Sequence, residues 1–188
     1  QKKYIDSNSI TFGKNLSATY SFKQNKNEMV EFAFKTNVIQ SKLVGSYNFN
    51  NLITSCSIGL HFKVDFQKIK NAIENYLPKN NRSELHYING KKIILDAYNA
   101  NPTSMMAAIE SFMQASGTKA VIIGEMLELG NFSIKEHLRI INLLEEKKIQ
   151  SFLVGDQFFQ NKKISESLFF FKNKKDLINK FPLAKINA

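Results

Sequence analysis

Residues 96–105 have the sequence Asp-Ala-Tyr-Asn-Ala-Asn-Pro-Thr-Ser-Met, in which small and amide side chains separate an apolar segment from an amphipathic one. The preceding residues 92–95 contain the apolar run Ile-Ile-Leu, which suits a buried parallel strand. Asn101 can act as a helix N-cap, and Pro102 suits the first helical position because no amide donor is needed there. Asp96 is therefore expected at the carboxyl end of a strand, where ligands bind in open α/β sheets.

From this turn to the end of the chain, apolar strand-like runs alternate with helical periods. The strands are expected at about residues 92–95, 119–123, 151–154 and 168–171, and the helices at about 102–115, 133–147 and 174–181. A repeat of roughly 30 residues is typical of βαβ units, so we predict an α/β fold with a Rossmann-like, mostly parallel sheet. Ser133 and Glu136 also have the spacing of a capping box.

The first part of the chain has a different pattern. Apolar and polar residues alternate around residues 20–34, with a turn near 24–27, which predicts a β-hairpin. Helical periods follow at about 47–62 and from Asp65, a plausible N-cap, to the stop at Pro78. Residues 79–81 are the best candidate for a linker, so the sequence predicts two domains, at residues 1–78 and 82–188.

The composition is that of a globular protein, with 43% hydrophobic and 22% charged residues in 188. Cys56 is the single cysteine, which excludes an intramolecular disulfide and favours a reducing compartment. The longest apolar runs are too short to span a membrane, so we expect no membrane insertion. The net charge of +10 raises the possibility of a basic binding module, but the lysines are dispersed in pairs without interleaved aromatic side chains. Solvated faces are the simpler reading, and no nucleic-acid partner is expected.

Four segments of the chain together resemble the Mur ligase family. Besides residues 96–105, they are Leu-Val-Gly-Ser-Tyr-Asn-Phe-Asn-Asn at 43–51, Tyr-Leu-Pro at 76–78 with Asn-Arg-Ser at 81–83, and Gly-Glu-Met-Leu-Glu-Leu-Gly at 124–130. Asn-Ala-Asn-Pro at 99–102 points to the group that joins D-alanyl-D-alanine to UDP-N-acetylmuramoyl-tripeptide. Ligases that add another amino acid, or glutamates to folate, tend to have a different turn here and are the alternatives within the superfamily.

The resemblance implies an ATP-dependent ligase that forms an acyl phosphate on the tripeptide, which the dipeptide amine then attacks. The phosphate-binding loop G-x-x-x-x-G-K-[ST] is absent from this sequence, which begins at Gln1. We therefore expect a piece of a longer enzyme. Residues 1–78 would be the C-terminal part of the central ATP-binding domain, and 82–188 the C-terminal ligase domain without its last strand.

The resemblance has further implications for the state of the protein. The piece alone should be inactive, and the Mg²⁺ ligands should lie outside it. The complete enzyme is expected to be a monomer in the bacterial cytoplasm.

The family resemblance also implies roles for individual residues. Contacts to ATP are expected from Asn48, Asn51, Arg82, Asp96, Tyr98 and Asn99. The two asparagines are three apart, so a helix would place both amides on one face, toward the adenine edge. Asp96 would accept from the ribose hydroxyls, and Arg82 would reach the phosphates as the catalytic residue. The alternatives are purely structural roles: a helix cap or buried hydrogen bond for the asparagines, a turn cap for Asp96 and a surface pair with Glu84 for Arg82.

Two acidic residues, Glu125 and Glu128, lie between glycines, and the resemblance implies that they contact the dipeptide. Tyr47 stands where many family members have histidine, which argues against proton transfer at this position. His137 is expected to be a packed or capping residue, Cys56 a small core residue, and no metal cluster is expected in this sequence.

Overall fold

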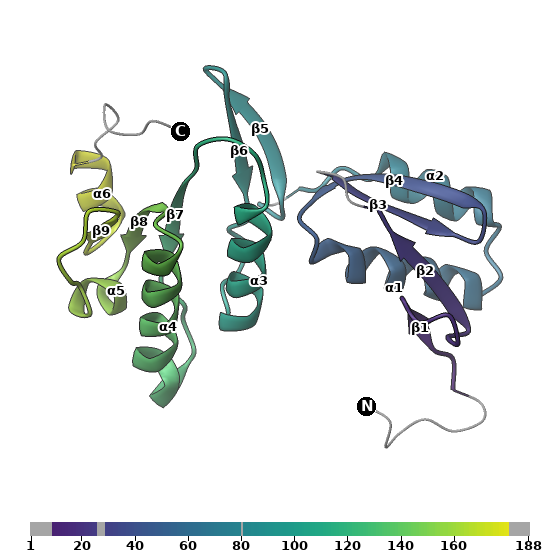
Figure 1. Cartoon of the computed structure of the whole chain (residues 1–188), viewed down its shortest axis with the longest axis horizontal. Helices are drawn as coiled ribbons and strands as arrows, with labels where there is room; N and C mark the ends of the chain where they lie inside the picture. The colour runs from purple at the N-terminus through teal and green to yellow at the C-terminus, as the bar shows by residue number, and fades with distance from the viewer. Residues whose placement is uncertain (1–8, 26–28, 80, 181–188) are drawn as a thin grey trace. The chain divides into compact units, whose positions relative to one another are not determined.

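The computed structural model describes residues 9–25, 29–79 and 81–180, and the chain forms two compact units that divide between Tyr98 and Asn99. Each unit combines helices with a β-sheet, as Figure 1 shows, so the predicted α/β class is confirmed. The linker predicted at 79–81 remains a prediction, and residue 80 lies outside the described residues.

The first unit begins with a four-stranded sheet. Its strands are β1 (Phe12–Gly13), β2 (Tyr20–Gln24), β3 (Met29–Phe34) and β4 (Asn37–Val44), in that spatial order. β2 and β3 pair antiparallel, with Phe22 opposite Phe34, so the predicted hairpin is confirmed although residues 26–28 of its turn are not described. β3 and β4 form a second hairpin, in which Lys35 at the turn has a φ of 53°.

Two helices, α1 (Asn48–His61) and α2 (Phe66–Asn75), cover one face of this sheet (Figure 1). The strands contribute alternate apolar side chains to that face, and the helices contribute apolar residues at helical spacing. The resulting buried core consists of Phe22, Val30, Phe32, Phe34, Ile39, Leu43, Phe49, Leu52, Ile53, Cys56, Ile69 and Ile73. Asp65 caps α2 by accepting a hydrogen bond from the Lys68 N–H, as predicted.

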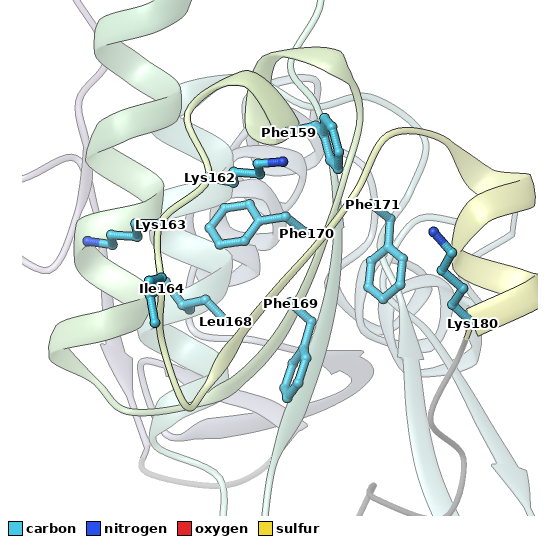
Figure 2. Close-up of a pocket in the computed structure, with 9 residues that line it drawn as sticks. All are labelled: Phe159, Lys162, Lys163, Ile164, Leu168, Phe169, Phe170, Phe171 and Lys180. Atoms are coloured by element: carbon cyan, nitrogen blue, oxygen red, sulfur yellow. The ribbon is translucent and has the colours of Figure 1, made fainter.

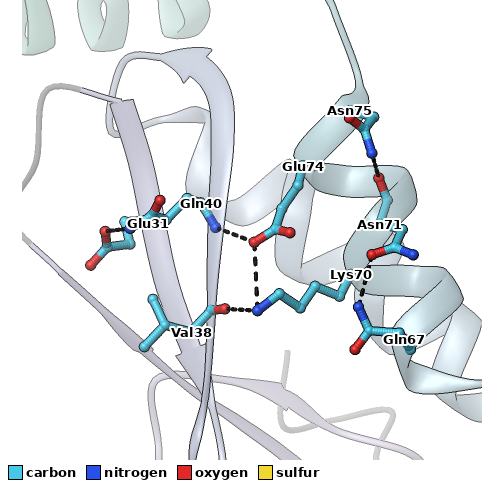
Figure 3. A network of polar contacts seen from close by, with 8 residues as sticks. All are labelled: Glu31, Val38, Gln40, Gln67, Lys70, Asn71, Glu74 and Asn75. Carbon is cyan, nitrogen blue, oxygen red and sulfur yellow. Dashed lines mark hydrogen bonds and ion pairs between the residues drawn. The ribbon is translucent and has the colours of Figure 1, made fainter.

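β4 is an edge strand of this sheet, and side chains of α2 form hydrogen bonds with backbone groups on its outer edge (Figure 3). The Gln40 N–H donates to Glu74 Oε1 at 3.2 Å, and Lys70 Nζ donates to the Val38 carbonyl at 2.8 Å. Lys70 and Glu74 also form an ion pair at 3.7 Å. The helix thus supplies the donor and acceptor that a fifth strand would otherwise provide, which protects this edge from pairing with another chain.

Replacing Glu74 by alanine is expected to lower the free energy of unfolding by about 1 kcal/mol, because the Gln40 N–H loses its partner in the protein. Urea unfolding of the chain measures this effect. Asn75→Ala is the matched control, since among the described residues the Asn75 amide donates to the Asn71 carbonyl of its own helix and to no group of β4. Equal losses for the two variants would contradict a role for Glu74 at the strand edge.

Residues 92–95 were expected to form a buried parallel strand, and that expectation is wrong. They belong to β6 (Lys91–Leu95), which pairs antiparallel with β5 (Glu84–Ile88) in a two-stranded sheet. The turn between them is Asn89-Gly90, whose φ values of 50° and 75° are both positive. An Asn-Gly pair favours this kind of two-residue hairpin turn, and it is the sequence signal that was missed.

The second unit contains the predicted parallel sheet. Its strands are β7 (Ala120–Gly124), β8 (Gln150–Val154) and β9 (Leu168–Phe171), in chain order and all parallel, which confirms this part of the prediction. Its helices are α3 (Pro102–Met113), α4 (Ser133–Glu146), α5 (Asp156–Gln160) and α6 (Lys174–Lys180), preceded at α4 by the 3₁₀ turn η2 (Gly130–Phe132). Ile140, Ile141 and Leu144 of α4 pack with Leu153 of β8 in the core.

The capping box predicted at Ser133 and Glu136 does not form. The N-cap position of α4 is taken by Phe132, because η2 leads directly into the helix and Ser133 is already helical, with φ −52° and ψ −55°. The Ser133 hydroxyl instead lies 3.3 Å from Nδ1 of His137, one turn later.

Candidate functional site

Asp96 follows the last residue of β6, in the open end of the β5–β6 hairpin. The register pairs Glu84 with Leu95, so Ser83 and Asp96 extend from the two strands side by side. Asp96 Oδ1 accepts from the Ser83 N–H at 3.2 Å, and Oδ2 accepts from the Tyr47 hydroxyl at 2.7 Å. Asp96 nevertheless remains exposed, so its carboxylate is held in place and accessible to a ligand.

The hydroxyls of Tyr47 and Ser83 extend this contact into a chain of hydrogen bonds. The two oxygens lie 2.8 Å apart, and Ser83 Oγ also accepts from Nδ2 of Asn48 at 3.2 Å. Because the Tyr47 proton goes to the Asp96 carboxylate, which can only accept, the Ser83 hydroxyl must donate to Tyr47. The donors and acceptors of this hydrogen-bonded series are therefore fully assigned, from Asn48 through Ser83 and Tyr47 to Asp96.

Asn48 and Asn51 lie in the first turn of α1, on one face as predicted. Asn48 is buried, and its amide donates to the Val44 carbonyl at 2.8 Å as well as to Ser83. Its Oδ1 accepts from Nδ2 of Asn51 at 3.1 Å. Asn51 is exposed, so of the two amides it is the one that presents atoms to solvent. A contact of either residue with adenine remains a prediction.

Tyr47 and Ser83 are the two residues of this cluster that the sequence analysis did not assign to the site. Burial, together with the nearby Asp96 carboxylate, raises the pKa of Tyr47 to about 12, so the phenol is a proton donor at neutral pH. Its ring packs over Gly45, where a Cβ would lie 2.4 Å from Cε1 of the ring, so no side chain fits there. Gly45 also has a φ of +91°, which favours glycine. The Leu-Val-Gly sequence at 43–45 belongs to the segment that resembles the Mur ligase family, and it directs attention to the neighbouring Tyr47. The partners of the Tyr47 hydroxyl become evident only from the pairing of β5 with β6, which brings Ser83 and Asp96 together.

Arg82 is exposed and stacks on the ring of Tyr98, with the guanidinium carbon 3.5 Å from the ring centroid. Such a cation–π contact fixes the plane of the guanidinium and leaves its N–H edges available for oxygen acceptors. Glu84, considered as a surface partner for Arg82, accepts from the Asn81 N–H at 2.6 Å and lies 3.3 Å from His86. Contacts of Arg82 and Tyr98 with ATP remain predictions.

The amides at the start of α3 have local roles. Asn101 Oδ1 accepts from the Ser104 N–H at 2.9 Å, with Pro102 in the first turn, so the predicted N-cap is confirmed. Asn99 is exposed, and its side-chain oxygen accepts from the Ala100 N–H at 2.9 Å. Its amide nitrogen is the group left to meet a nucleotide or an acyl phosphate.

Glu125 joins the ends of two strands in the second unit. Its backbone N–H donates to the Val154 carbonyl at 2.9 Å, and its carboxylate accepts from the Gln157 N–H at 3.1 Å. Glu128 is exposed and has a φ of 63°, in the loop that follows β7. Glu128 therefore has a more accessible carboxylate than Glu125. The contacts of these two residues with the dipeptide remain predictions.

Gly155→Ala is expected to destabilise the second unit by about 2 kcal/mol or more. Gly155 has a φ of +131°, and a Cβ there would lie 2.6 Å from Cδ of Glu125. Gly117→Ala is the matched control, since Gly117 has a φ of +86° with nothing within 4 Å of its Cβ position and so suffers backbone strain alone. In urea unfolding, Gly155→Ala should have a clearly lower free energy of unfolding than Gly117→Ala. The reverse order would contradict the steric role of Glu125.

His137 is fully buried and packed, as predicted. Its Nε2 accepts from the Met126 N–H at 3.0 Å, so the ring proton is on Nδ1, which donates to the Ser133 carbonyl at 2.7 Å. The ring packs edge-on against Phe158 at 4.7 Å. His137 thereby holds the loop that contains Glu125 and Glu128 against α4.

A hollow of about 630 Å³ lies beside β9, lined by apolar side chains and three lysines (Figure 2). None of the predicted site residues lines it. Lys163 is paired with Glu145, and Lys180 with Asp176 at 2.6 Å, while Lys162 lies over the Phe159 ring at 4.3 Å. The lysines are thus engaged with neighbouring side chains and do not form an open anion site.

Within residues 9–25, 29–79 and 81–180, no three His, Cys, Asp or Glu side chains are grouped so that they could hold a metal ion. Over the same described residues, no helix has the length and apolar character needed to cross a membrane. Cys56 is buried in the core of the first unit, and burial raises the pKa of its thiol to about 11, as befits a structural cysteine.

Residues 81–184 match a family model described as "Mur ligase, glutamate ligase domain". The chain belongs to the Mur ligase family. This match covers more than half of the 188 residues, including β5, β6 and the whole described part of the second unit.

Among curated Mur ligases, UDP-N-acetylmuramoyl-tripeptide--D-alanyl-D-alanine ligase from Buchnera aphidicola subsp. Acyrthosiphon pisum is 30% identical over 141 residues. That alignment covers 74% of this chain and 31% of the relative. The enzyme of the same name from Buchnera aphidicola subsp. Baizongia pistaciae is 32% identical over 115 residues, which are 60% of this chain and 25% of the relative. The chain thus spans about a quarter to a third of the length of these relatives.

Solved structures show the same fold. A crystal structure of MurF from Acinetobacter baumannii has a TM-score of 0.78 and 24% identity, covering 90% of this chain and 39% of that one. MurF ligase from Thermotoga maritima in complex with ADP has a TM-score of 0.67 and 20% identity, covering 87% of this chain and 39% of that one.

Proposed function

We propose that this chain is part of an ATP-dependent ligase that joins D-alanyl-D-alanine to UDP-N-acetylmuramoyl-tripeptide in the synthesis of peptidoglycan precursors. The observation that carries the proposal is the turn at residues 96–105, in which an accessible carboxylate, the Asn-Ala-Asn-Pro sequence and a capped helix follow one another along the chain. The names of the aligned relatives support the same substrates.

In this proposal, residues 1–78 are the end of the ATP-binding domain and residues 82–188 are the C-terminal ligase domain. The nucleotide is gripped by groups from both, with Asn51 on α1 and Asp96 after β6. Asn48 supports Asn51 through their amide contact. Asp96 accepts from the ribose, and Tyr98 and Asn99 line the nucleotide or the acyl phosphate.

The chemistry assigned to this chain is positioning and charge stabilisation. Arg82 directs its guanidinium edge at the phosphate oxygens, where charge develops as the phosphoryl group moves to the tripeptide carboxylate. Mg²⁺ would be held by residues outside this chain and would supply neutralisation of the phosphate charge. The dipeptide amine then attacks the acyl phosphate, which forms the amide bond and releases phosphate. Glu125 and Glu128 are the residues proposed to contact the dipeptide.

The test is ATP turnover by the complete ligase with UDP-N-acetylmuramoyl-tripeptide and D-alanyl-D-alanine together. We expect ADP release that requires both substrates, and none when a single amino acid or a folate with glutamate replaces them. Turnover with those replacements would favour another Mur or folylpolyglutamate-type ligase. The 188-residue chain alone should turn over no ATP, because it has no phosphate-binding loop.

The remaining properties follow from this proposal. An enzyme that consumes ATP belongs in the cytoplasm of the bacterium, and the single cysteine is compatible with that compartment. The ligase is proposed to act as a monomer. A noncatalytic basic binding module is the alternative of another class, and nucleic-acid binding at 0.2 M salt without any ligase activity would favour it.

A further inference from the structure

We propose that Tyr47 is a positioning residue for ATP, which holds the Asp96 carboxylate in the orientation that receives the ribose hydroxyls. This inference rests on the proposed nucleotide role of Asp96 and adds a residue to it. Tyr47 itself acts through Asp96.

The geometry gives Asp96 a defined orientation before any ligand arrives. An exposed aspartate ordinarily samples several rotamers, and ordering it on binding costs free energy. Here the Tyr47 hydroxyl at 2.7 Å and the Ser83 N–H at 3.2 Å each occupy one carboxylate oxygen. The Ser83 N–H is fixed by the hairpin backbone, and the Tyr47 ring is fixed over Gly45.

The number of acceptor sites on the carboxylate supports this role. An ionised carboxylate has about four lone-pair directions. Among the described residues, Tyr47 and Ser83 use one on each oxygen, which leaves one for a ligand on each oxygen. Two free acceptors on one exposed carboxylate match the two neighbouring hydroxyls of a ribose.

The rest of the cluster keeps the Tyr47 proton directed at Asp96. Ser83 Oγ, itself accepting from Asn48 at 3.2 Å, donates to the phenol oxygen at 2.8 Å, so the phenol has its own proton left for the carboxylate. The phenol keeps this proton at neutral pH, because burial raises the pKa of Tyr47 to about 12. The alternative is a purely structural role, in which the Tyr47 ring packs against Gly45 and its hydroxyl contributes nothing to ATP binding.

The test is a double-mutant cycle in the complete ligase with Tyr47→Phe and Asp96→Ala, read as KM and kcat for ATP. Tyr47→Phe keeps the ring on Gly45 and removes only the hydroxyl. We expect it to raise the KM for ATP by about 2- to 10-fold with kcat unchanged, the range that corresponds to ordering one side chain. In the Asp96→Ala background the same change should raise KM no further.

Tyr87→Phe is the matched control, since Tyr87 lies exposed on β5 and should leave KM unchanged. Thermal melts of every variant check folding. If Asp96→Ala raises KM but Tyr47→Phe does not, or if Tyr47→Phe acts equally in both backgrounds, the positioning role is overturned while the role of Asp96 stands. If Asp96→Ala leaves KM unchanged, the nucleotide role of Asp96 fails, and the positioning role fails with it.

Discussion

Arg82→Ala in the complete ligase is expected to lower kcat by roughly 100- to 1000-fold, with a much smaller rise in the KM for ATP. The reason is that the guanidinium would stabilise charge that develops on the transferring phosphoryl group, so its loss is felt in the transition state more than in the ground state. The Tyr98 ring, 3.5 Å from the guanidinium carbon, fixes the plane of this donor. Steady-state kinetics at saturating tripeptide precursor and dipeptide measure the effect.

Two further variants make this test specific. Lys91→Ala removes an exposed positive charge from β6 in the same unit and should leave both constants unchanged. Arg82→Lys retains the charge without the planar fork and should recover only part of kcat. A rise in KM at unchanged kcat for Arg82→Ala would show instead that Arg82 contributes uniform binding.

Asp96→Ala is expected to raise the KM for ATP by about 10- to 150-fold, which corresponds to roughly 1.5 to 3 kcal/mol for hydrogen bonds to a charged carboxylate. The effect on kcat should be small, because the ribose does not change during phosphoryl transfer. Isothermal titration with ADP offers a second measurement, free of turnover.

The control for Asp96 is Glu74→Ala, which also removes a carboxylate that accepts from a backbone N–H in the first unit. It should leave KM unchanged. Asp96→Asn, which retains an acceptor oxygen for the Ser83 N–H, separates loss of binding from loss of fold. Near-normal kinetics for Asp96→Ala would reduce this residue to a structural cap of the hairpin.

The sequence predicted the elements whose local signals agree with their tertiary setting. Asp65 and Asn101 have both the side chain and the position of N-caps, and both form the expected hydrogen bonds. The parallel strands β7 to β9 are apolar runs with helical segments between them, and the structure confirms their order. The two caps are local features, whereas the order of the strands follows from the regular alternation of strands and helices along the chain.

The expectations that failed depend on residues outside the motif itself. The Ile-Ile-Leu run before Asp96 is compatible with a parallel or an antiparallel strand, and only the Asn89-Gly90 turn distinguishes them. Ser133 and Glu136 have capping-box spacing, but the preceding 3₁₀ turn shifts the start of the helix. The partners of Tyr47 are 36 and 49 positions away in the sequence, so periodicity could not reveal them.

The phenol at position 47 also bears on how this ligase would respond to acid. A histidine side chain changes charge near pH 6.5. The pKa of Tyr47 is raised to about 12, so the phenol stays uncharged from acidic to strongly alkaline pH. The hydrogen bond that the Tyr47 hydroxyl donates to Asp96 therefore does not depend on a change of protonation at position 47 over that range.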